Sequence, residues 1–161
     1  MAKTIRHEMH YDASIDQVAA MLADPAFREE VCRSQGVTKV EVDVTPGADG
    51  AKQVRIDQWQ PTQGVPGFAK KIVGDETNIV QEESWTSATH GDITVTIPGK
   101  PGDMKGTAVL VEDGAGVVET VELTVKVKIP VVGGKLEGLI ADLLLKALKA
   151  ENRVGRDYLS R

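Results

Sequence analysis

The amino-acid sequence predicts an α+β fold in which a seven-stranded, curved antiparallel sheet wraps around one long C-terminal helix. Two observations lead to this prediction. Residues 37–129 carry a succession of strand patterns separated by turn residues, and two short helical patterns precede them. Residues 133–159 form the longest stretch without an internal breaker. A chain of 161 residues is long enough for a hydrophobic core, so we expect residues 1–161 to form a single domain.

The composition is ordinary for a globular protein and excludes several functional classes. Hydrophobic residues make up 41% of the chain, charged residues 27%, and the formal net charge is −5. No basic cluster interrupts the sequence, so we expect no nucleic-acid partner. No apolar run reaches membrane-spanning length, so we expect no stable membrane insertion. Cys32 is the single cysteine, which excludes an intrachain disulfide and fits a cytoplasmic location.

The chain begins with a strand followed by two short helices. Residues 3–11 alternate between apolar and polar side chains, which is typical of a half-buried strand. Ser14 stands three residues before Gln17, the spacing of a helix-capping box. Asp24 and Pro25 then provide an N-cap and a first helical residue for a second helix. We therefore expect two helices directly after the first strand.

Strand patterns dominate the middle of the chain. They cover residues 40–44, 54–60, 79–86, 93–97, 104–112 and 117–129. The last of these has one apolar and one polar face, as in an antiparallel sheet that is covered on one side. Residues 61–76 do not alternate, and we expect a long loop with about one and a half helical turns. Phe68 and Ile72 would give this loop an apolar side, as in a lid over a binding site.

The C-terminal stretch predicts a helix of roughly 25 residues, about 37 Å long, that begins near Lys135. Its polar residues form one narrow stripe: Asp142, Lys146, Lys149 and Arg153. Because the remaining circumference is mostly apolar, this helix is either a plain core helix or one that lines a cavity. The concave face of the predicted sheet is the place for it, and a pocket is expected between the two.

Two stretches resemble a known superfamily. Residues 11–18 (YDASIDQV) followed by residues 22–25 (LADP) look like the entry of many bacterial members of the START and polyketide-cyclase superfamily. Residues 129–137 (IPVVGGKLE) look like the approach to their final helix. The resemblance covers the whole chain and is closest to a bacterial branch of unknown function. It implies the helix-grip fold and binding of lipids, sterols, polyketides or other apolar molecules, and it transfers no catalytic residue.

The candidate ligand-binding residues are those expected on the pocket walls: Trp59, Phe68, Ile72, Glu83, Trp85, Val121, Leu123, Ile140, Leu143 and Ala147. The orientation of two strands stays open at this point. If Trp85 points inward, Glu83 does too, and burial would raise its pKa. If instead Val80 marks the inner face, Glu83 is exposed. Glu119 is expected at the pocket rim, near the end of its strand.

Three functions are compatible with these observations. The first is binding of a small hydrophobic molecule or lipid between the sheet and the C-terminal helix, with Ala147 near the opening towards residues 61–76. The second is a cyclase- or hydrolase-type enzyme with Glu83, His7 or Arg55 in the same pocket. The third is a protein-interaction domain with an exposed apolar patch of several hundred Å². The histidines are not spaced as metal ligands, so we expect no metal and no cofactor.

Overall fold

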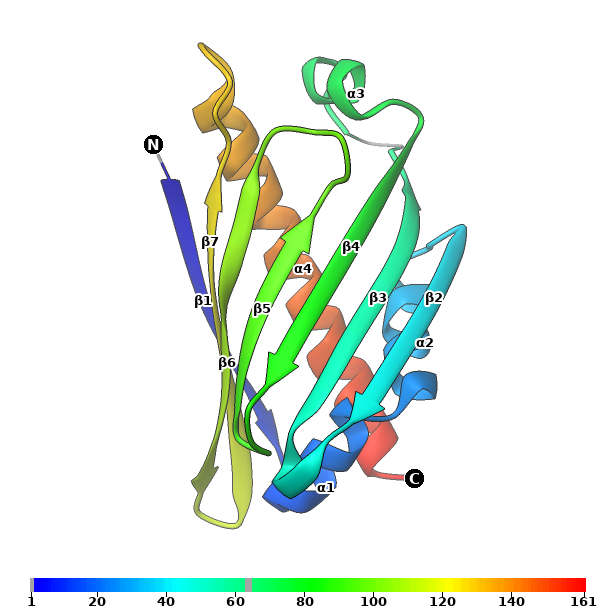
Figure 1. The fold of residues 1–161 in the computed structure, drawn as a ribbon, viewed down its shortest axis with the longest axis vertical. Helices are drawn as coiled ribbons and strands as arrows, with labels where there is room; N and C mark the ends of the chain where they lie inside the picture. Colours follow the sequence, from blue (N-terminus) through cyan, green and yellow to red (C-terminus); the bar gives the residue numbers. More distant parts are fainter. Residues whose placement is uncertain (1, 63–64) are drawn as a thin grey trace.

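The structure is a computed structural model that describes residues 2–62 and 65–161. The elements follow the expected order, and their bounds are β1 Ala2–Tyr11, α1 Ile15–Leu22, α2 Pro25–Ser34, β2 Lys39–Pro46, η1 Ala48–Gly50, β3 Lys52–Pro61, α3 Gly67–Val73, β4 Glu76–Trp85, β5 His90–Thr96, β6 Asp103–Asp113, β7 Gly116–Lys126 and α4 Gly133–Leu159 (Figure 1).

The seven strands form one antiparallel sheet with the order β1-β7-β6-β5-β4-β3-β2. The sheet curves around α4, which crosses its concave face diagonally (Figure 1). Helices α1 and α2 lie at the end of the sheet where α4 finishes, and α3 lies at the opposite end. This arrangement confirms the predicted helix-grip fold.

The local signals at the start of the chain act as expected. Ser14 accepts a hydrogen bond from the Gln17 backbone N–H, and the Gln17 side chain accepts one from the Ser14 N–H. Asp24 caps α2 by accepting from the Ala26 N–H at 2.9 Å. Its second carboxylate oxygen accepts from the Tyr158 hydroxyl at 2.6 Å, which ties the start of α2 to the end of α4.

The connection between β7 and α4 differs from the expectation. The last strand was predicted to run to Ile129, but β7 ends at Lys126 because the next N–H, that of Val127, donates to the Glu137 carboxylate at 2.9 Å. Helix α4 begins at Gly133, two residues earlier than expected. A side chain at Gly133 would place its Cβ 2.7 Å from the Val127 carbonyl oxygen, so this close approach requires glycine.

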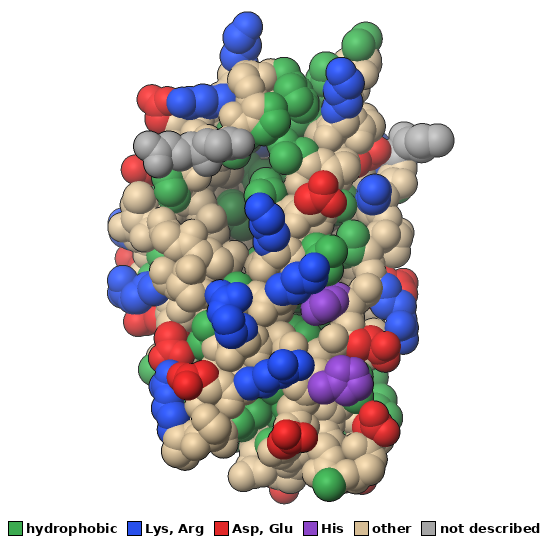
Figure 2. All heavy atoms as spheres, turned by 180° about the vertical axis from the view of Figure 1, so that it is seen from behind, with side chains coloured by type: hydrophobic (Ala, Val, Ile, Leu, Met, Phe, Trp, Pro, Cys, Tyr) green, Lys and Arg blue, Asp and Glu red, His purple; other side chains and the backbone are tan. Residues whose placement is uncertain are grey.

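Helix α4 has the exposed polar stripe that its sequence predicts. Asp142, Lys146, Lys149 and Arg153 are all exposed. Figure 2 shows this side of the molecule, where Lys and Arg side chains follow a line along its middle. Among the described residues, no helix is both long and apolar enough to cross a membrane.

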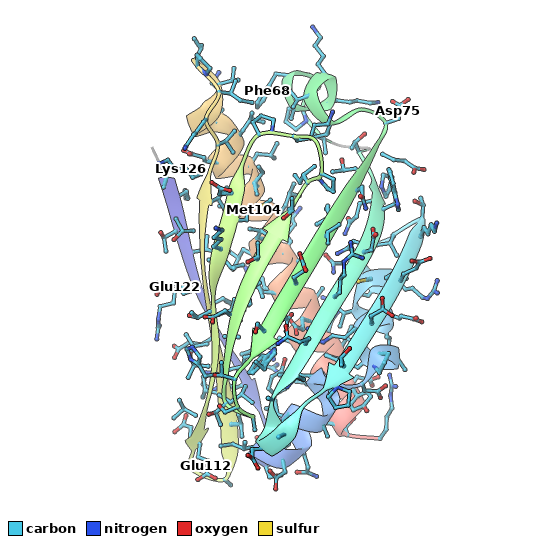
Figure 3. All side chains as sticks on the ribbon, viewed as in Figure 1. Phe68, Asp75, Met104, Glu112, Glu122 and Lys126 are labelled. Carbon is cyan, nitrogen blue, oxygen red and sulfur yellow. The ribbon has the colours of Figure 1, made fainter. Side chains whose placement is uncertain are left out.

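The outer face of the sheet is polar where the pattern of β7 predicts it. Glu122 and Lys126 are exposed and project from this face (Figure 3). Met104 in the adjacent strand β6 is buried on the concave side. Most of the buried apolar side chains of the sheet therefore face α4.

The segment between β3 and β4 contains one short helix, as expected. Its base is fixed by Thr62, whose hydroxyl donates to the carbonyl oxygens of Gly74 and Asp75 at 2.7 and 2.9 Å. Between these anchors α3 carries a single buried residue, Ala69. Gly64, which the sequence assigns to this loop, lies outside the described residues.

Candidate ligand-binding cavity

A cavity lies between the concave face of the sheet and α4. It consists of two chambers with volumes of about 410 and 430 Å³. The residues that line both chambers are Gln35, Gln60, Ile79, Val95, Leu143 and Leu144. Because these wall residues are shared, the two chambers adjoin, and we describe them as an outer chamber beside α3 and an inner chamber beside α2.

The outer chamber is mostly aliphatic, and its polar side chains, Gln35, Gln60, Thr62 and Thr77, are all uncharged. Its walls include Val65, Ala69 and Val73 from the α3 segment. Leu136, Leu139 and Ile140 of α4 form the opposite wall. Figure 2 shows a hollow lined by hydrophobic side chains near the end of the molecule that carries α3. This chamber suits the apolar part of a ligand.

The inner chamber combines aliphatic walls with a polar end. The aliphatic walls include Ile56, Val121 and Leu123 from the sheet and Ala147 from α4. The polar end consists of side chains from four separate elements: Arg28, Gln81, Glu83, Glu119 and Glu151. Such charged groups are rarely buried without partners, so their contacts define what this end can bind.

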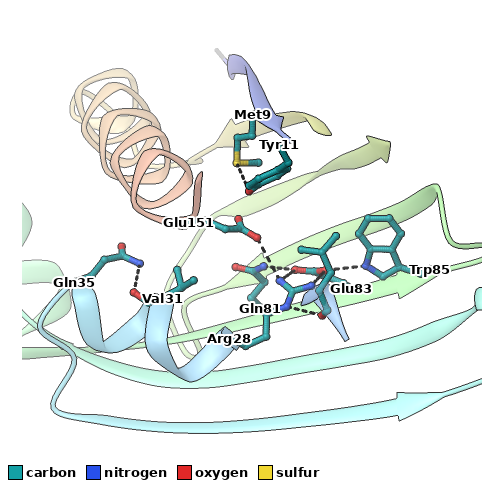
Figure 4. Close-up of polar contacts among 10 residues, drawn as sticks. Met9, Tyr11, Arg28, Val31, Gln35, Gln81, Glu83, Trp85 and Glu151 are labelled. Atoms are coloured by element: carbon teal, nitrogen blue, oxygen red, sulfur yellow. Dashed lines mark hydrogen bonds and ion pairs between the residues drawn. The ribbon is translucent and has the colours of Figure 1, made fainter. Parts of the chain in front are cut away.

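Arg28 and Glu83 form the centre of the polar end (Figure 4). The two terminal guanidinium nitrogens of Arg28 donate to the two carboxylate oxygens of Glu83 at 2.9 and 2.8 Å. The Nε of Arg28 donates to the Leu22 carbonyl oxygen at 2.8 Å, which fixes the guanidinium to the end of α1. This parallel, bidentate geometry is the strongest arrangement for an arginine–carboxylate pair.

Neighbours on the same face of β4 complete the contacts of Glu83. Gln81 and Trp85, two residues away on either side, both donate to its carboxylate, Trp85 at 2.8 Å. The Lys52 ammonium lies over the Trp85 ring, 4.2 Å from its centroid. Opposite Trp85 in β5 stands Gly91, where a Cβ would come within 2.6 Å of the ring, so this position requires glycine.

The contacts of Glu83 reverse the pKa shift that the sequence suggested. Burial by itself would raise the pKa of this carboxyl, but the charge of Arg28 and the hydrogen bonds it receives lower the pKa below its usual value. The pKa of Arg28 is raised, because Glu83 and Glu151 outweigh the effect of burial. Glu83 and Arg28 are therefore a permanently charged pair.

Glu119 in β7 and Glu151 in α4, unlike Glu83, receive no hydrogen bond from Arg28. Glu151 lies 3.7 Å from Arg28, beyond hydrogen-bond distance. Glu119 is 3% exposed, and its Oε1 has no hydrogen-bond partner among the described residues. Burial and the charge of Glu151 raise the pKa of Glu119 well above its usual value. Burial raises the pKa of Glu151 to about 7. The negative charge of Glu83 adds to this increase, and the positive charge of Arg28 opposes it.

Six of the residues predicted from the sequence line the cavity. They are Glu83, Val121, Leu123, Ile140, Leu143 and Ala147. Ile140 lines the outer chamber, Leu143 lines both, and the others line the inner one. Their role in binding a ligand remains a prediction, but their placement on the cavity wall is as expected.

The other four predicted residues do not line either chamber. Trp59 is 37% exposed on the outer face of β3, because the inward side chains of this strand are Val54, Ile56 and Gln58. Trp85 points inward but is covered by its own contacts with Glu83 and Lys52. Phe68 is exposed and Ile72 half-buried. The face of α3 that lines the cavity carries Ala69 and Val73 instead, and Val65, which precedes the helix, lines the same chamber.

Two further expectations about the cavity were wrong. Glu119 was expected at the rim but is buried at the polar end. Ala147 was expected towards residues 61–76, but it lines the inner chamber, whereas α3 lines the outer one. The N-terminal half of α4 faces α3, so the opening on that side lies beside Leu136 and Ile140 rather than beside Ala147.

Sequence reasoning missed Arg28 and Glu151. Both stand in amphipathic helices at positions where a charged residue normally faces water. One signal was present: Arg28 is separated by four residues from both Asp24 and Cys32, and so shares a helix face with buried Cys32. Of the enzyme candidates, His7 is half-exposed outside the cavity, and Arg55 forms an exposed ion pair with Asp57 at 3.6 Å.

Comparison with known families shows to which family the chain belongs. The family model described as "Protein of unknown function (DUF2505)" matches residues 6–159, which is nearly the whole sequence. The chain belongs to the DUF2505 family. An uncharacterized protein of Mycobacterium tuberculosis is 31% identical over 169 residues, with 95% of this chain and 94% of that protein covered. The expected membership of a bacterial branch of unknown function is thereby confirmed.

Solved structures show where the DUF2505 fold belongs. The Zhui aromatase/cyclase from a Streptomyces species has a TM-score of 0.68 at 12% identity, with 100% of this chain and 95% of that chain covered. A START superfamily protein from Mycobacterium smegmatis has a TM-score of 0.59 at 18% identity, with coverage of 95% and 97%. At these identities the likeness concerns the fold, which is that of START proteins and polyketide aromatase/cyclases.

Proposed function

We propose that this protein binds a small hydrophobic molecule or lipid in the cavity between the sheet and α4. The observation that carries the proposal is the pair of adjoining chambers whose walls are mostly aliphatic, with charged side chains only in the inner chamber. Each chamber lies in the range of roughly 300–1,000 Å³ typical of small-molecule sites. The similarity in fold to START proteins supports the proposal.

Helix α4 distinguishes this proposal from a plain core. A helix that only completes a core buries all its sheet-facing residues, whereas Leu143 and Ala147 line open space. The exposed large apolar side chains come from separate segments, including Trp59 in β3, Phe68 in α3 and Val111 in β6. A concave, mostly apolar space between sheet and helix favours a small ligand over a protein partner, which would need an exposed apolar patch.

Binding of the uncharged fluorescent dye Nile red tests the proposal. The wild-type protein is expected to bind it saturably, with increased emission. In Ala147→Trp the new ring would occupy the inner chamber and abolish or strongly weaken binding. Lys149→Trp adds the same ring to the exposed side of α4 and should bind like wild type. No binding by the wild type, or equal binding by all three proteins, would end the proposal.

A cyclase- or hydrolase-type activity in the same cavity is the second candidate. The observation that favours it is the Glu119–Glu151 pair, because a carboxyl whose pKa is raised to about 7 can donate and accept protons near neutral pH. For an uncharged substrate, Glu151→Gln should lower turnover far more than it lowers affinity. Unchanged turnover in this variant would exclude the pair as the acid–base group.

A further inference from the structure

The polar end of the inner chamber has an imbalance of charge. Arg28 at this end and Lys52 behind the chamber wall are the two basic side chains, and Glu83, Glu119 and Glu151 are the three acidic ones; each is largely buried. With all five groups ionised, two positive charges face three negative charges, an excess of one negative charge. Buried charge without compensation is costly, so this end of the cavity favours one additional positive charge.

The basic groups nearby are already engaged. The Arg28 guanidinium is held by Glu83 and the Leu22 carbonyl oxygen. The Lys52 ammonium lies over the Trp85 ring. Lys146 and Arg153 also line the inner chamber, but both are exposed, so water and salt screen their charges.

The remaining titratable neighbours carry no positive charge. Tyr11 in β1 and Cys32 in α2 both have raised pKa values, mainly because they are buried, and stay neutral at physiological pH. No other described residue donates a hydrogen bond to the Glu119 Oε1. The missing partner of this carboxylate must therefore come from outside the chain or be a proton.

We infer that the inner chamber binds an amphipathic amine, whose ammonium group donates hydrogen bonds to Glu119 and Glu151 while its apolar body fills the aliphatic chambers. The inference rests on the proposed function and specifies the chemical class of the ligand. One bound ammonium makes three positive charges against three negative ones. A metal ion is not favoured, because the described residues contain no group of three or more acidic, His or Cys side chains placed to hold one.

Binding of the ammonium group is coupled to release of a proton. In the empty protein the raised pKa values of Glu119 and Glu151 mean that the pair keeps a proton near neutral pH. The ammonium replaces it: one carboxyl O–H bond breaks and the proton passes to the buffer. Lower pH favours the protonated pair, so affinity for an amine should increase as pH rises from 6 to 8.

Three probes with the same ten-carbon chain test the head group: decylamine, decanol and decanoate. Their affinities are measured by isothermal titration calorimetry at physiological salt, which screens the net charge of the protein. Decylamine should bind at least about tenfold more tightly than decanol, because hydrogen bonds to charged groups are the stronger ones. Decanoate should bind most weakly. Titrations in two buffers of different ionisation enthalpy should show proton release with decylamine and none with decanol.

Variants assign the effect to the carboxyl pair. Glu119→Gln and Glu151→Gln keep the size of the side chain and should each reduce the preference for decylamine over decanol towards unity. Glu122→Gln is the control, because it removes a carboxylate from the exposed face of the same strand, β7. Melting curves verify that each variant is folded, and if one carboxamide variant does not fold, the other decides.

The possible outcomes separate the two proposals. Equal affinity for decylamine and decanol would overturn the amine inference and leave the proposed function intact. A preference for decylamine that survives in the glutamine variants would also overturn it. Failure of the wild type to bind either decylamine or decanol, together with no Nile red binding, would overturn the proposed function as well.

Discussion

Arg28 in α2 and Glu83 in β4 are joined by two hydrogen bonds of 2.9 and 2.8 Å, although 55 residues separate them in the sequence. Both side chains are almost completely buried. This pair fixes α2 against the sheet at the polar end of the cavity. Removing one partner would leave the other as an unpaired buried charge, which is far more costly than losing the pair as a whole.

Arg28→Met and Glu83→Gln are therefore expected to lower the free energy of unfolding by about 3–5 kcal/mol each. The double variant Arg28→Met/Glu83→Gln should lose less than the sum of the single losses, because no unpaired charge remains. Urea denaturation measures all three. Arg55→Met, which breaks the exposed pair with Asp57, is the control and should cost at most about 1 kcal/mol. Additive losses in the double variant would contradict the coupling.

Stability of the empty protein should decrease as pH rises from about 5 to 8. Glu119 and Glu151 have raised pKa values when folded, so the folded state binds more protons than the unfolded state in this range. Their stabilising contribution is complete below the ordinary carboxyl pKa and is lost as pH rises through the folded values. His7, whose pKa is lowered mainly by burial, acts in the opposite direction.

Melting temperatures of wild type and Glu119→Gln/Glu151→Gln across this pH range separate these effects. Each unit of pKa shift corresponds to about 1.4 kcal/mol, so the wild type should show a clear decline. The double variant should lack it and should be the more stable protein at pH 8. A wild-type decline that persists unchanged in the double variant would assign the pH dependence to other groups.

A large side chain at position 147 should have little effect on stability if the space beside Ala147 is open. Ala147→Trp places a ring in the inner chamber and should change the melting temperature little. Ala141→Trp is the matched comparison, because Ala141 is 1% exposed on the same helix and lines neither chamber. Overpacking there should cost about 1–3 kcal/mol or more. Equal destabilisation by both variants would show that the space around Ala147 is effectively solid.

Residues of α3 should become protected when a ligand binds. This helix has one buried residue, Ala69, and its N-cap residue Pro66 makes no side-chain capping bond. We expect its amide hydrogens to exchange rapidly in the empty protein and more slowly with bound Nile red, because Val65, Ala69 and Val73 line the outer chamber. Amides of α2 serve as the internal control for general stabilisation. Equal exchange in α3 with and without ligand would remove the lid interpretation.

The order and type of the elements could be predicted from the sequence because their signals are local. The Ser14–Gln17 capping box, the Asp24–Pro25 helix start and the polar stripe of α4 each involve residues within a few positions of one another. A cavity was also predicted, because the long C-terminal helix is apolar over most of its circumference and the last strand has one apolar and one polar face. These features depend on the periodicity of apolar residues and on the spacing of capping residues, both of which can be read from one sequence.

Sequence spacing could not show which face of β4 points towards α4, because both of its faces contain buried residues. Val80 is 7% exposed on one face, and Glu83 is 4% exposed on the other. Alternation therefore does not identify the concave side. What decides it is Arg28, which comes from a different element and offers Glu83 two hydrogen bonds inside the protein.

The polar end of the cavity was decided by tertiary structure alone. Arg28, Glu83, Glu119 and Glu151 come from α2, β4, β7 and α4, and no sequence spacing relates them. A charged residue in an amphipathic helix or at a strand end is normally solvated, so the two missed groups, Arg28 and Glu151, and the misplaced Glu119 all had ordinary local environments. Only the curvature of the sheet around α4 removes them from water together. Burial raises the pKa of all three carboxyls, but Arg28 and the hydrogen bonds to Glu83 lower the pKa of Glu83, so Arg28 and Glu83 form a charged pair while Glu119 and Glu151 keep raised pKa values.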